Sequence, residues 1–183
     1  MQDIGSGTLL LLIHGGDGAT PSFRHLIPLR TKTHRVIAIG LPSQGFTVLG
    51  SKLRGGLTAM AEEVKARWLQ ENWQPLIVVG HSAGAALALR MGEIIPDKAL
   101  IGIIAAFGKF DGVAGWFLTI LAKILAITPL VAQVFSKFAE IPSRVRQLLT
   151  SSGSRIEHDV EVQCLHLLRM HSHVDATLAI MAH

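Results

Sequence analysis

The sequence is poor in cysteine, with only Cys164 among its 183 residues. A single cysteine excludes an internal disulfide framework and is typical of proteins in the reducing cytoplasm. The first residues carry no basic segment ahead of their apolar run, so the sequence does not predict a secretory signal peptide. Both features predict a cytoplasmic protein.

Charged residues are also few: they make up 16% of the chain, and the formal net charge is +4. The basic residues are scattered singly, without the Lys/Arg runs or the interleaved aromatic and basic residues of nucleic-acid-binding proteins. Apolar residues make up 49%, which argues against extensive disorder. The composition therefore predicts an ordinary domain with a hydrophobic core and no nucleic-acid partner.

Uninterrupted apolar segments long enough to cross a bilayer are missing as well. The run at 8–13 is too short, and the longer one at 112–135 is interrupted by Lys123 and Pro129. We expect two short helices there, apolar around much of their circumference, that cover a core, a lipophilic ligand or a membrane surface. The sequence thus predicts no transmembrane span and leaves contact with a membrane surface open.

Short apolar segments alternate with amphipathic ones over the first half of the chain. Buried strands separated by helices predict a mostly parallel sheet with helices on both faces, an α/β fold. The strands are expected at 9–14, 35–40, 75–80 and 99–108, and the helices at 20–27 (capped by Thr20), 57–69 and 83–95.

After residue 108 only helical patterns follow, at 113–127, 130–138, 142–150 and 160–182. We therefore divide the chain into an α/β core, residues 1–111, and a helical lid, residues 112–183. Residues 160–164 alternate as in a strand before helical spacing takes over, and we expect one continuous helix over 160–182.

The pentapeptide Gly-His-Ser-Ala-Gly, residues 80–84, lies between a predicted strand and a predicted helix. This context is that of a nucleophile elbow, in which a strained turn projects the serine hydroxyl above the sheet. Gly80 and Gly84 fit because larger side chains would collide with the adjacent strand and helix. The pattern predicts Ser82 as a catalytic nucleophile, with an ordinary serine in a β–α turn as the alternative.

An oxyanion hole needs two backbone N–H donors, one from the residue after the nucleophile and one from the loop after an earlier strand. Ala83 fits the first role. Gly16, in the segment His-Gly-Gly, is our candidate for the second, although this glycine-rich segment could also be a flexible turn. We expect His14 to be a structural hydrogen-bonding residue, because a base would follow the serine in the chain.

The order and spacing of HGG, GLPSQGFT and GHSAGAALALR resemble the α/β-hydrolase superfamily. Together with GLTAMAEEV, FDGVAGWFLTILAKILA, SSGSRIEHD and HVDATLAIMAH, nearly the whole chain resembles one family within it, the magnesium-chelatase accessory proteins of bacteriochlorophyll biosynthesis. Gly40 and Ser43 depart from the superfamily pattern Asp-x-Pro-Gly-x-Gly, standing at its Asp and Gly. The resemblance implies an α/β-hydrolase fold and a role near the magnesium-insertion step.

In that superfamily two further strands follow the lid, and their loops carry the catalytic acid and histidine. The resemblance therefore implies that this chain is truncated before those strands, and the strands that open the fold look absent too. Asp111 is a weak substitute for the acid, and so are the downstream histidines for the base: His158, His166, His171, His173 and His183. We expect the chain alone to hydrolyse esters poorly or not at all.

Two alternatives stay open. The fold could be a non-catalytic binding module whose apolar lid, with Trp116, Phe117 and Ile120, holds a tetrapyrrole or an isoprenoid tail or docks on magnesium chelatase. It could also be a general hydrolase of lipophilic esters. Each hypothesis implies a small lipophilic or tetrapyrrole-like substrate or ligand, and the sequence predicts no cofactor and no bound metal.

Overall fold

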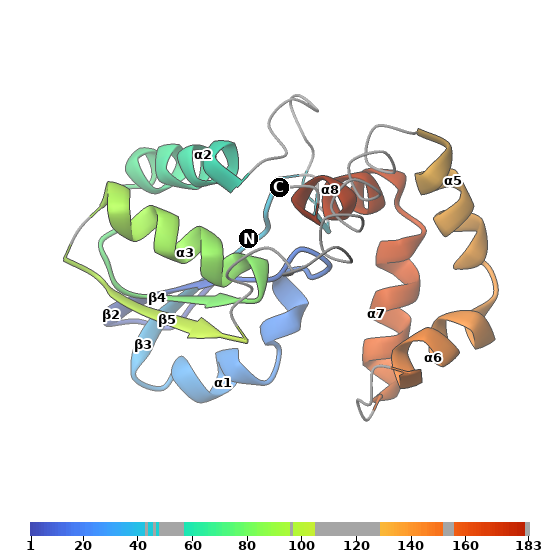
Figure 1. Cartoon of the computed structure of the whole chain (residues 1–183). Helices are drawn as coiled ribbons and strands as arrows, with labels where there is room; N and C mark the ends of the chain where they lie inside the picture. Colours follow the sequence, from blue (N-terminus) through green and yellow to red (C-terminus); the bar gives the residue numbers. More distant parts are fainter. Residues whose placement is uncertain are drawn as a thin grey trace.

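One five-stranded sheet organises the first part of the molecule (Figure 1). This computed structural model describes residues 1–42, 44–45, 47, 57–95, 97–104, 129–151 and 156–181. The strand order is β1-β3-β2-β4-β5, in which β2 to β5 run parallel and β1 runs antiparallel to β3. The strands are β1 (Gln2–Ile4), β2 (Thr8–Ile13), β3 (His34–Ile39), β4 (Pro75–His81) and β5 (Ala99–Ile103).

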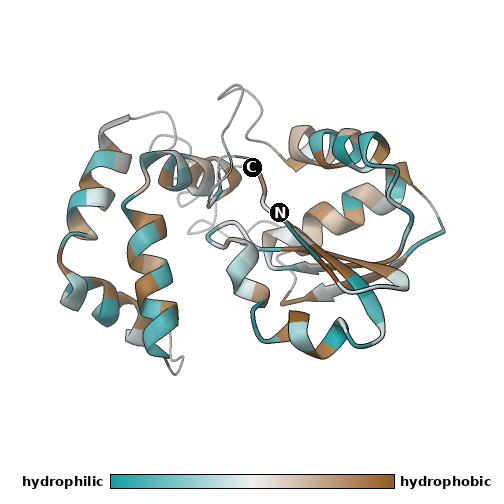
Figure 2. Ribbon diagram, turned by 180° about the vertical axis from the view of Figure 1, so that it is seen from behind, coloured by the Kyte–Doolittle hydropathy of each residue, from teal (hydrophilic) through white to brown (hydrophobic). Residues whose placement is uncertain are grey.

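The predicted mostly parallel sheet with helices on both faces is confirmed. The 3-10 helix η1 (Thr20–Phe23) and α1 (Leu26–Arg30) cover one face, and α2 (Leu57–Gln70) and α3 (Ala83–Ile94) cover the other (Figure 1). Successive side chains of β2 point to opposite faces of the sheet. Leu10 and Leu12 pack toward α1, whereas Leu11 and Ile13 pack toward α2 and α3. The central strands are correspondingly hydrophobic over most of their length (Figure 2).

The segment predicted as a helix over 20–27 differs from the expectation. It forms the 3-10 turn η1 and then α1, and Thr20 is not the cap. Ala19 has the extended N-cap backbone, and its N–H donates to the hydroxyl of Ser22 at 3.2 Å. Ser22, inside the turn, therefore supplies the side chain of the capping hydrogen bond, and Thr20 does not.

Four helices follow the sheet: α5 (Pro129–Phe138), α6 (Pro142–Ser151), α7 (His158–Leu168) and α8 (His171–Met181). Helix α8 lies between the sheet and the other three (Figure 1). No helix in the described ranges has the length and apolar character needed to span a membrane. The helix predicted over 113–127 and the end of the strand predicted over 99–108 lie outside the described residues.

The single helix predicted over 160–182 is wrong, because the chain turns between α7 and α8. No glycine or proline marks the break. Arg169 donates from its Nε to the carbonyl oxygen of Ala139 at 3.2 Å, and the Met170 carbonyl accepts the N–H groups of His173 and Val174 at 3.0 and 3.1 Å. The turn directs α8 toward the loops that follow β2 and β3, which it contacts at Gly16 and Gly45. Tertiary contacts therefore override the local helical pattern.

Ion pairs connect the start of α7 to the first helical turn of the sheet region. Arg24 lies 3.2 Å from a carboxylate oxygen of Glu157 and 2.5 Å from one of Asp159. His25 reaches the same Glu157 oxygen at 3.3 Å. His25, Glu157 and Asp159 also form an exposed group of the side-chain types that bind metals, and Arg24 pairs with both of its carboxylates.

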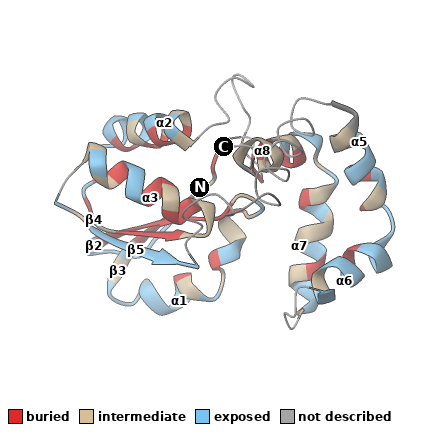
Figure 3. Ribbon diagram, viewed as in Figure 1, coloured by how far each residue is buried: buried red, intermediate tan, exposed pale blue. Residues whose placement is uncertain are grey.

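Strand β5 forms one edge of the sheet. All five of its residues are exposed, although Leu100, Ile101 and Ile103 are apolar (Figure 3). Helix α3 packs against this strand through Gly92, where an added β-carbon would lie 2.4 Å from a methyl carbon of Leu100. The strand is thus held by β4 and α3 on its inner side.

Candidate active site

Ser82 stands at the junction of β4 and α3 in a conformation that L-residues rarely adopt. Its φ is 52° and its ψ is −121°. Hydrogen bonds hold the turn on both sides: the Ser82 N–H donates to the Ile103 carbonyl at 2.9 Å, and the Ser82 carbonyl accepts the Ala85 N–H at 2.9 Å. The residue is half-buried and not sealed in the core. This is the strained strand–turn–helix geometry expected of a nucleophile elbow, and the catalytic role stays a prediction.

The two glycines that flank the serine have no room for a side chain. A β-carbon on Gly80 would lie 2.1 Å from the Gly84 carbonyl oxygen, and one on Gly84 would lie 2.4 Å from the carbonyl oxygens of Ile13 and His14. Real β-carbons do not approach backbone atoms this closely. The pentapeptide therefore needs glycine at both ends so that α3 can lie directly on β4 and β2.

The glycine-rich turn after β2 lies beside the serine. A β-carbon on Gly15 would lie 3.1 Å from the Ser82 β-carbon, so the chain passes the elbow at contact distance. The Gly15 carbonyl accepts hydrogen bonds from His14 Nδ1 at 2.7 Å and from the Gly18 N–H at 3.1 Å. Because a trans peptide holds its carbonyl and N–H in opposite directions, these bonds also set the direction of the Gly16 N–H.

His14 has the structural role that its position predicts. Its ring is fully buried, its Nε2 accepts the Leu41 N–H at 3.1 Å, and its Nδ1 donates to the Gly15 carbonyl. Burial lowers the pKa of His14 from 6.5 to about 4, so the ring is neutral near pH 7. Both nitrogens are engaged with backbone groups, which leaves His14 unable to act as a base toward Ser82.

The carbonyl of Gly16 receives two side-chain donors that the sequence did not point to. Gln44 Nε2, from the loop after β3, lies 2.5 Å from it, and Thr177 Oγ1, from α8, lies 2.7 Å from it. The GLPSQG segment departs from its superfamily pattern at other positions and gives no sign of this contact for Gln44. No motif marks Thr177, whose role depends on where α8 docks.

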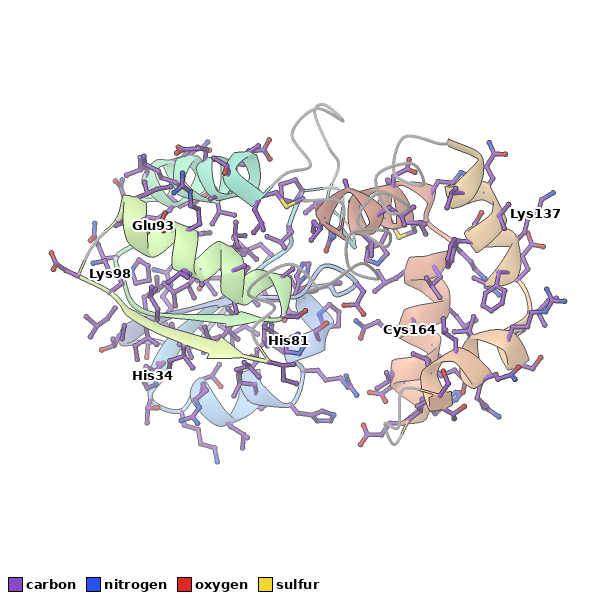
Figure 4. The ribbon with its side chains drawn as sticks, viewed as in Figure 1. His34, His81, Glu93, Lys98, Lys137 and Cys164 are labelled. Atoms are coloured by element: carbon purple, nitrogen blue, oxygen red, sulfur yellow. The ribbon has the colours of Figure 1, made fainter. Side chains whose placement is uncertain are left out.

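Ala83, the other predicted oxyanion donor, is the first residue of α3. Its N–H therefore belongs to the first turn of the helix, where backbone donors have no partner within the helix. The positive end of the helix dipole acts in the same place and favours negative charge beside Ser82. His81, on the other side of the serine, ends β4 next to this first turn (Figure 4).

The structure brings no described histidine or carboxylate into hydrogen-bonding contact with the Ser82 hydroxyl. His158, His166 and His171 are exposed, whereas His173 is buried. The Nδ1 of His173 accepts the Gly45 N–H at 3.1 Å. Burial lowers the pKa of His173, while the Asp17 carboxylate and a hydrogen bond to the Asp17 backbone act in the opposite direction. The predicted residues Asp111, Trp116, Phe117, Ile120 and His183 lie outside the described residues.

Two further features lie apart from the serine. A cavity of about 200 Å³ opens beside Gly40, with Arg67 and Trp73 in its wall, and neither Ser82 nor Gly16 lines it. Cys164 lies on α7, on the far side of α8 from the sheet (Figure 4). Burial raises the pKa of the Cys164 thiol, which disfavours its nucleophilic thiolate form.

A model of the alpha/beta hydrolase family matches residues 10–174, which include most of β2, the elbow and most of the C-terminal helices. The chain belongs to this family. The strained serine and the adjacent glycine turn of an α/β-hydrolase are thus present in a chain whose family membership rests on independent evidence.

Two curated proteins are similar in sequence. The chain is 36% identical over 176 residues to the magnesium-chelatase 30 kDa subunit of Rhodobacter capsulatus, which covers 96% of this chain and 62% of that protein. It is 28% identical over 144 residues to the dihydrolipoyllysine-residue acetyltransferase component of an acetoin cleaving system of Pseudomonas putida, covering 78% of this chain and 39% of that protein. The chain therefore spans less than two thirds of either relative.

Among solved structures, the epoxide hydrolase CorEH without ligand superposes with a TM-score of 0.81. The match covers 98% of this chain and 67% of the epoxide hydrolase, at 16% sequence identity. This likeness confirms the predicted α/β-hydrolase fold and, at such low identity, carries no information about the substrate.

Proposed function

We propose that this α/β-hydrolase has a serine-hydrolase-type site, with Ser82 as nucleophile and the backbone N–H groups of Gly16 and Ala83 as oxyanion donors. The observation that carries the proposal is the conformation of Ser82, with φ 52° and ψ −121° between β4 and α3. Backbone strain of this kind persists where the surrounding structure enforces it, and it concentrates at catalytic sites.

The chemistry would follow from this geometry. A histidine takes the proton of the serine hydroxyl as the oxygen attacks an acyl carbon, and an acid orients that histidine. Negative charge that develops on the substrate oxygen is stabilised by the two N–H groups and the first turn of α3. Because no described histidine contacts Ser82, we propose that this chain alone is weakly active or inactive.

We further propose that the protein acts in bacteriochlorophyll biosynthesis, near magnesium chelatase, in the cytoplasm. The 36% identity to the Rhodobacter capsulatus subunit over 176 residues supports this placement. The helices of residues 112–183 would form a lid over a small lipophilic or tetrapyrrole-like ligand, with Trp116, Phe117 and Ile120 in its wall. Since the chain spans 62% of that relative, these assignments need their own test.

A labelling experiment with exogenous base tests the site. The chain is treated with a fluorophosphonate with and without imidazole, which can act as the base in place of a histidine side chain. We expect slow labelling of Ser82 alone and at least a tenfold acceleration by imidazole, measured by mass spectrometry of the labelled peptide. Ser82→Ala is the control and should stay unlabelled. No labelling with imidazole would contradict the nucleophile, and fast labelling without it would contradict the missing base.

A non-catalytic binding module is the second candidate, and the lack of a described base at Ser82 favours it. Mutagenesis of the longer Rhodobacter capsulatus relative separates the two functions: the residue that aligns with Ser82 is substituted by alanine. Loss of pigment synthesis at unchanged protein level would support chemistry. Unchanged pigment synthesis would support binding or scaffolding.

A further inference from the structure

Helix α8 docks on the turn that contains Gly16 through residues on one of its faces. Thr177 Oγ1 donates to the Gly16 carbonyl at 2.7 Å, and methyl Cγ2 of Ile180 would lie 3.4 Å from a β-carbon at Gly16. One turn earlier, His173 Nδ1 accepts the N–H of Gly45. Positions 173, 177 and 180 have the spacing that places side chains on one helical face. Helix α8 thus contacts both the turn that lies beside the elbow and the loop after β3.

The loop after β3 completes the arrangement through Gln44. Its side chain is fully buried and donates from Nε2 to the Gly16 carbonyl that also accepts from Thr177. Its Oε1 is buried without a hydrogen-bond partner in the described part of the chain. A buried, unpaired amide oxygen is unfavourable, so packing alone does not explain why Gln44 keeps this orientation.

These contacts fix the two peptide groups on either side of the Gly16 α-carbon. The preceding peptide is held at the Gly15 carbonyl by His14 and Gly18. The following peptide is held at the Gly16 carbonyl by Gln44 and Thr177. Glycine has the widest conformational freedom of any residue, so only such external bonds can confine the direction of its N–H.

We propose that Thr177 of α8 and Gln44 of the β3 loop hold the peptide that follows Gly16 and, by limiting rotation at this glycine, act together with the bonds at the Gly15 carbonyl to position the Gly16 N–H as an oxyanion donor. The inference rests on the proposed function, which gives that N–H its role. Both are positioning residues, since they act on the carbonyl side of the turn and not on a substrate. The second oxyanion donor is then in place only while α8 is docked.

The Thr177 hydroxyl has one proton for two carbonyls, because Oγ1 also lies 2.9 Å from the His173 carbonyl within α8. Thr177→Val removes the proton and keeps the branched shape, whereas Thr177→Ser keeps the proton. Thr150→Val is the matched control: Thr150 makes the same kind of bond within α6, to the Arg146 carbonyl at 2.9 Å, and is exposed. Gln44→Leu removes the amide at similar size, together with its unpaired oxygen.

The direct measurement is the ¹⁵N relaxation of the Gly16 and Asp17 amides in the full chain. We expect an order parameter of about 0.85 for both, as in rigid backbone. In the variant that combines Thr177→Val with Gln44→Leu, the value for Asp17, whose N–H belongs to the released peptide, should fall below about 0.6, and that for Gly16 should fall less, because its own peptide stays held at the Gly15 carbonyl. Each single change should have a smaller effect, since one donor remains. The Ala83 amide should stay rigid throughout, and Thr177→Ser and Thr150→Val should leave Gly16 and Asp17 unchanged.

The midpoint of urea unfolding separates a positioning role at Gly16 from a general contribution to the stability of the fold. Gln44→Leu removes one donor to Gly16 but also removes the buried, unpaired oxygen, so the midpoint of urea unfolding should not fall. A looser Asp17 amide at unchanged midpoint is the expected signature. An Asp17 order parameter that stays at the rigid value in the combined variant would overturn the proposal. Loosening in Thr177→Ser equal to that in Thr177→Val would overturn the role of the hydroxyl.

Imidazole-assisted labelling of Ser82 then links the position of Gly16 to chemistry. The combined variant should slow labelling by up to about 100-fold, the effect of losing one oxyanion donor. An unchanged labelling rate together with a mobile Gly16 would overturn its role as a donor. If the parent chain is not labelled at all, the proposed function fails, and the relaxation data still decide whether Thr177 and Gln44 hold the turn.

Discussion

The sheet region and the C-terminal helices are held together by different kinds of contact. In the sheet region, β2 and β3 bury long apolar stretches, with Leu11, Leu12 and Ile13 of β2 at 0% exposure. In α5 to α8 the buried apolar residues of the described part are few and widely spaced: Ala139, Val145, Leu167, Val174 and Ala176 (Figure 3). Hydrogen bonds and ion pairs from Arg24, His173 and Thr177 join the helices to the sheet region, together with Ile180 of α8, which packs against its core.

This difference predicts how each region responds to change. Apolar burial around the sheet depends on shape, so steric substitutions there should have large effects. Polar contacts at the surface of the helices are weaker individually and depend on pH and salt. The substitutions below test that division, beginning with the largest expected effect.

Gly84→Ala should be the most damaging change. The new methyl group would lie 2.4 Å from two carbonyl oxygens of the β2 end, so either α3 or β2 must shift. We expect a loss of about 3 kcal/mol in the free energy of unfolding, measured by urea titration. Gly16→Ala is the control at the boundary with α8: its methyl group meets only Ile180, at 3.4 Å, and should cost less than about 1 kcal/mol. Equal losses in the free energy of unfolding would contradict the expectation that steric substitutions cost more around the sheet than at its boundary with α8.

Acid should destabilise the sheet region through His14. The pKa of His14 is about 4 in the folded chain, against 6.5 for a free histidine. Above pH 6.5 neither state binds the proton; between 6.5 and 4 only the unfolded chain does, so stability falls, by about 3 kcal/mol in total. Urea titrations at several pH values across this range should show that the free energy of unfolding depends less steeply on pH in His14→Asn than in the parent chain. His158→Gln, at an exposed position of α7, should keep the parent slope.

Ser82→Gly should stabilise the chain. Glycine adopts φ 52° and ψ −121° without the penalty that the serine β-carbon brings, so we expect a gain of about 1 kcal/mol in thermal or urea unfolding. The control is Asn72→Gly, at an exposed turn with φ 50°. Asparagine tolerates positive φ, so this gain should be only a few tenths of a kcal/mol. Destabilisation by Ser82→Gly would show that the turn is not strained.

Arg24→Gln should have the smallest effect on global stability and a local effect on α7. Arg24 pairs with Glu157 and Asp159, which are 60% and 55% exposed, so we expect at most about 1 kcal/mol, reduced by salt. Hydrogen exchange of the α7 amides should quicken at low salt. Arg67→Gln is the matched control, because its ion pair with Glu71 connects the last turn of α2 only to the residue that directly follows the helix. Faster α7 exchange in Arg67→Gln would refute a specific joint at Arg24.

The parts of the molecule that follow from local sequence could be predicted. The glycines around Ser82 are required by contacts between neighbouring elements, and short apolar runs identified β2 to β5. Strand β1 was missed because Gln2–Ile4 is short and exposed, without an apolar pattern. The break between α7 and α8 was missed because it is produced by contacts with distant segments and not by a helix-breaking residue.

The positioning contacts at Gly16 could not be predicted for the same reason. Gln44 is 28 residues from Gly16 and Thr177 is 161 residues away, and neither residue type identifies its partner. Sequence patterns report which face of an element is apolar. They do not report which distant carbonyl a threonine hydroxyl will meet.

Ser82 is held by strand β5 on one side, in addition to its contact with the turn after β2. The outer side of β5 bears main-chain groups that no described strand satisfies, and the strand contains no proline or charged residue to discourage pairing. The Ile103 carbonyl on its inner side holds the N–H of Ser82. A group that shields this edge from water would also strengthen the hydrogen bond that anchors Ser82, so we expect the conformation of the Ser82 turn to respond to what covers β5.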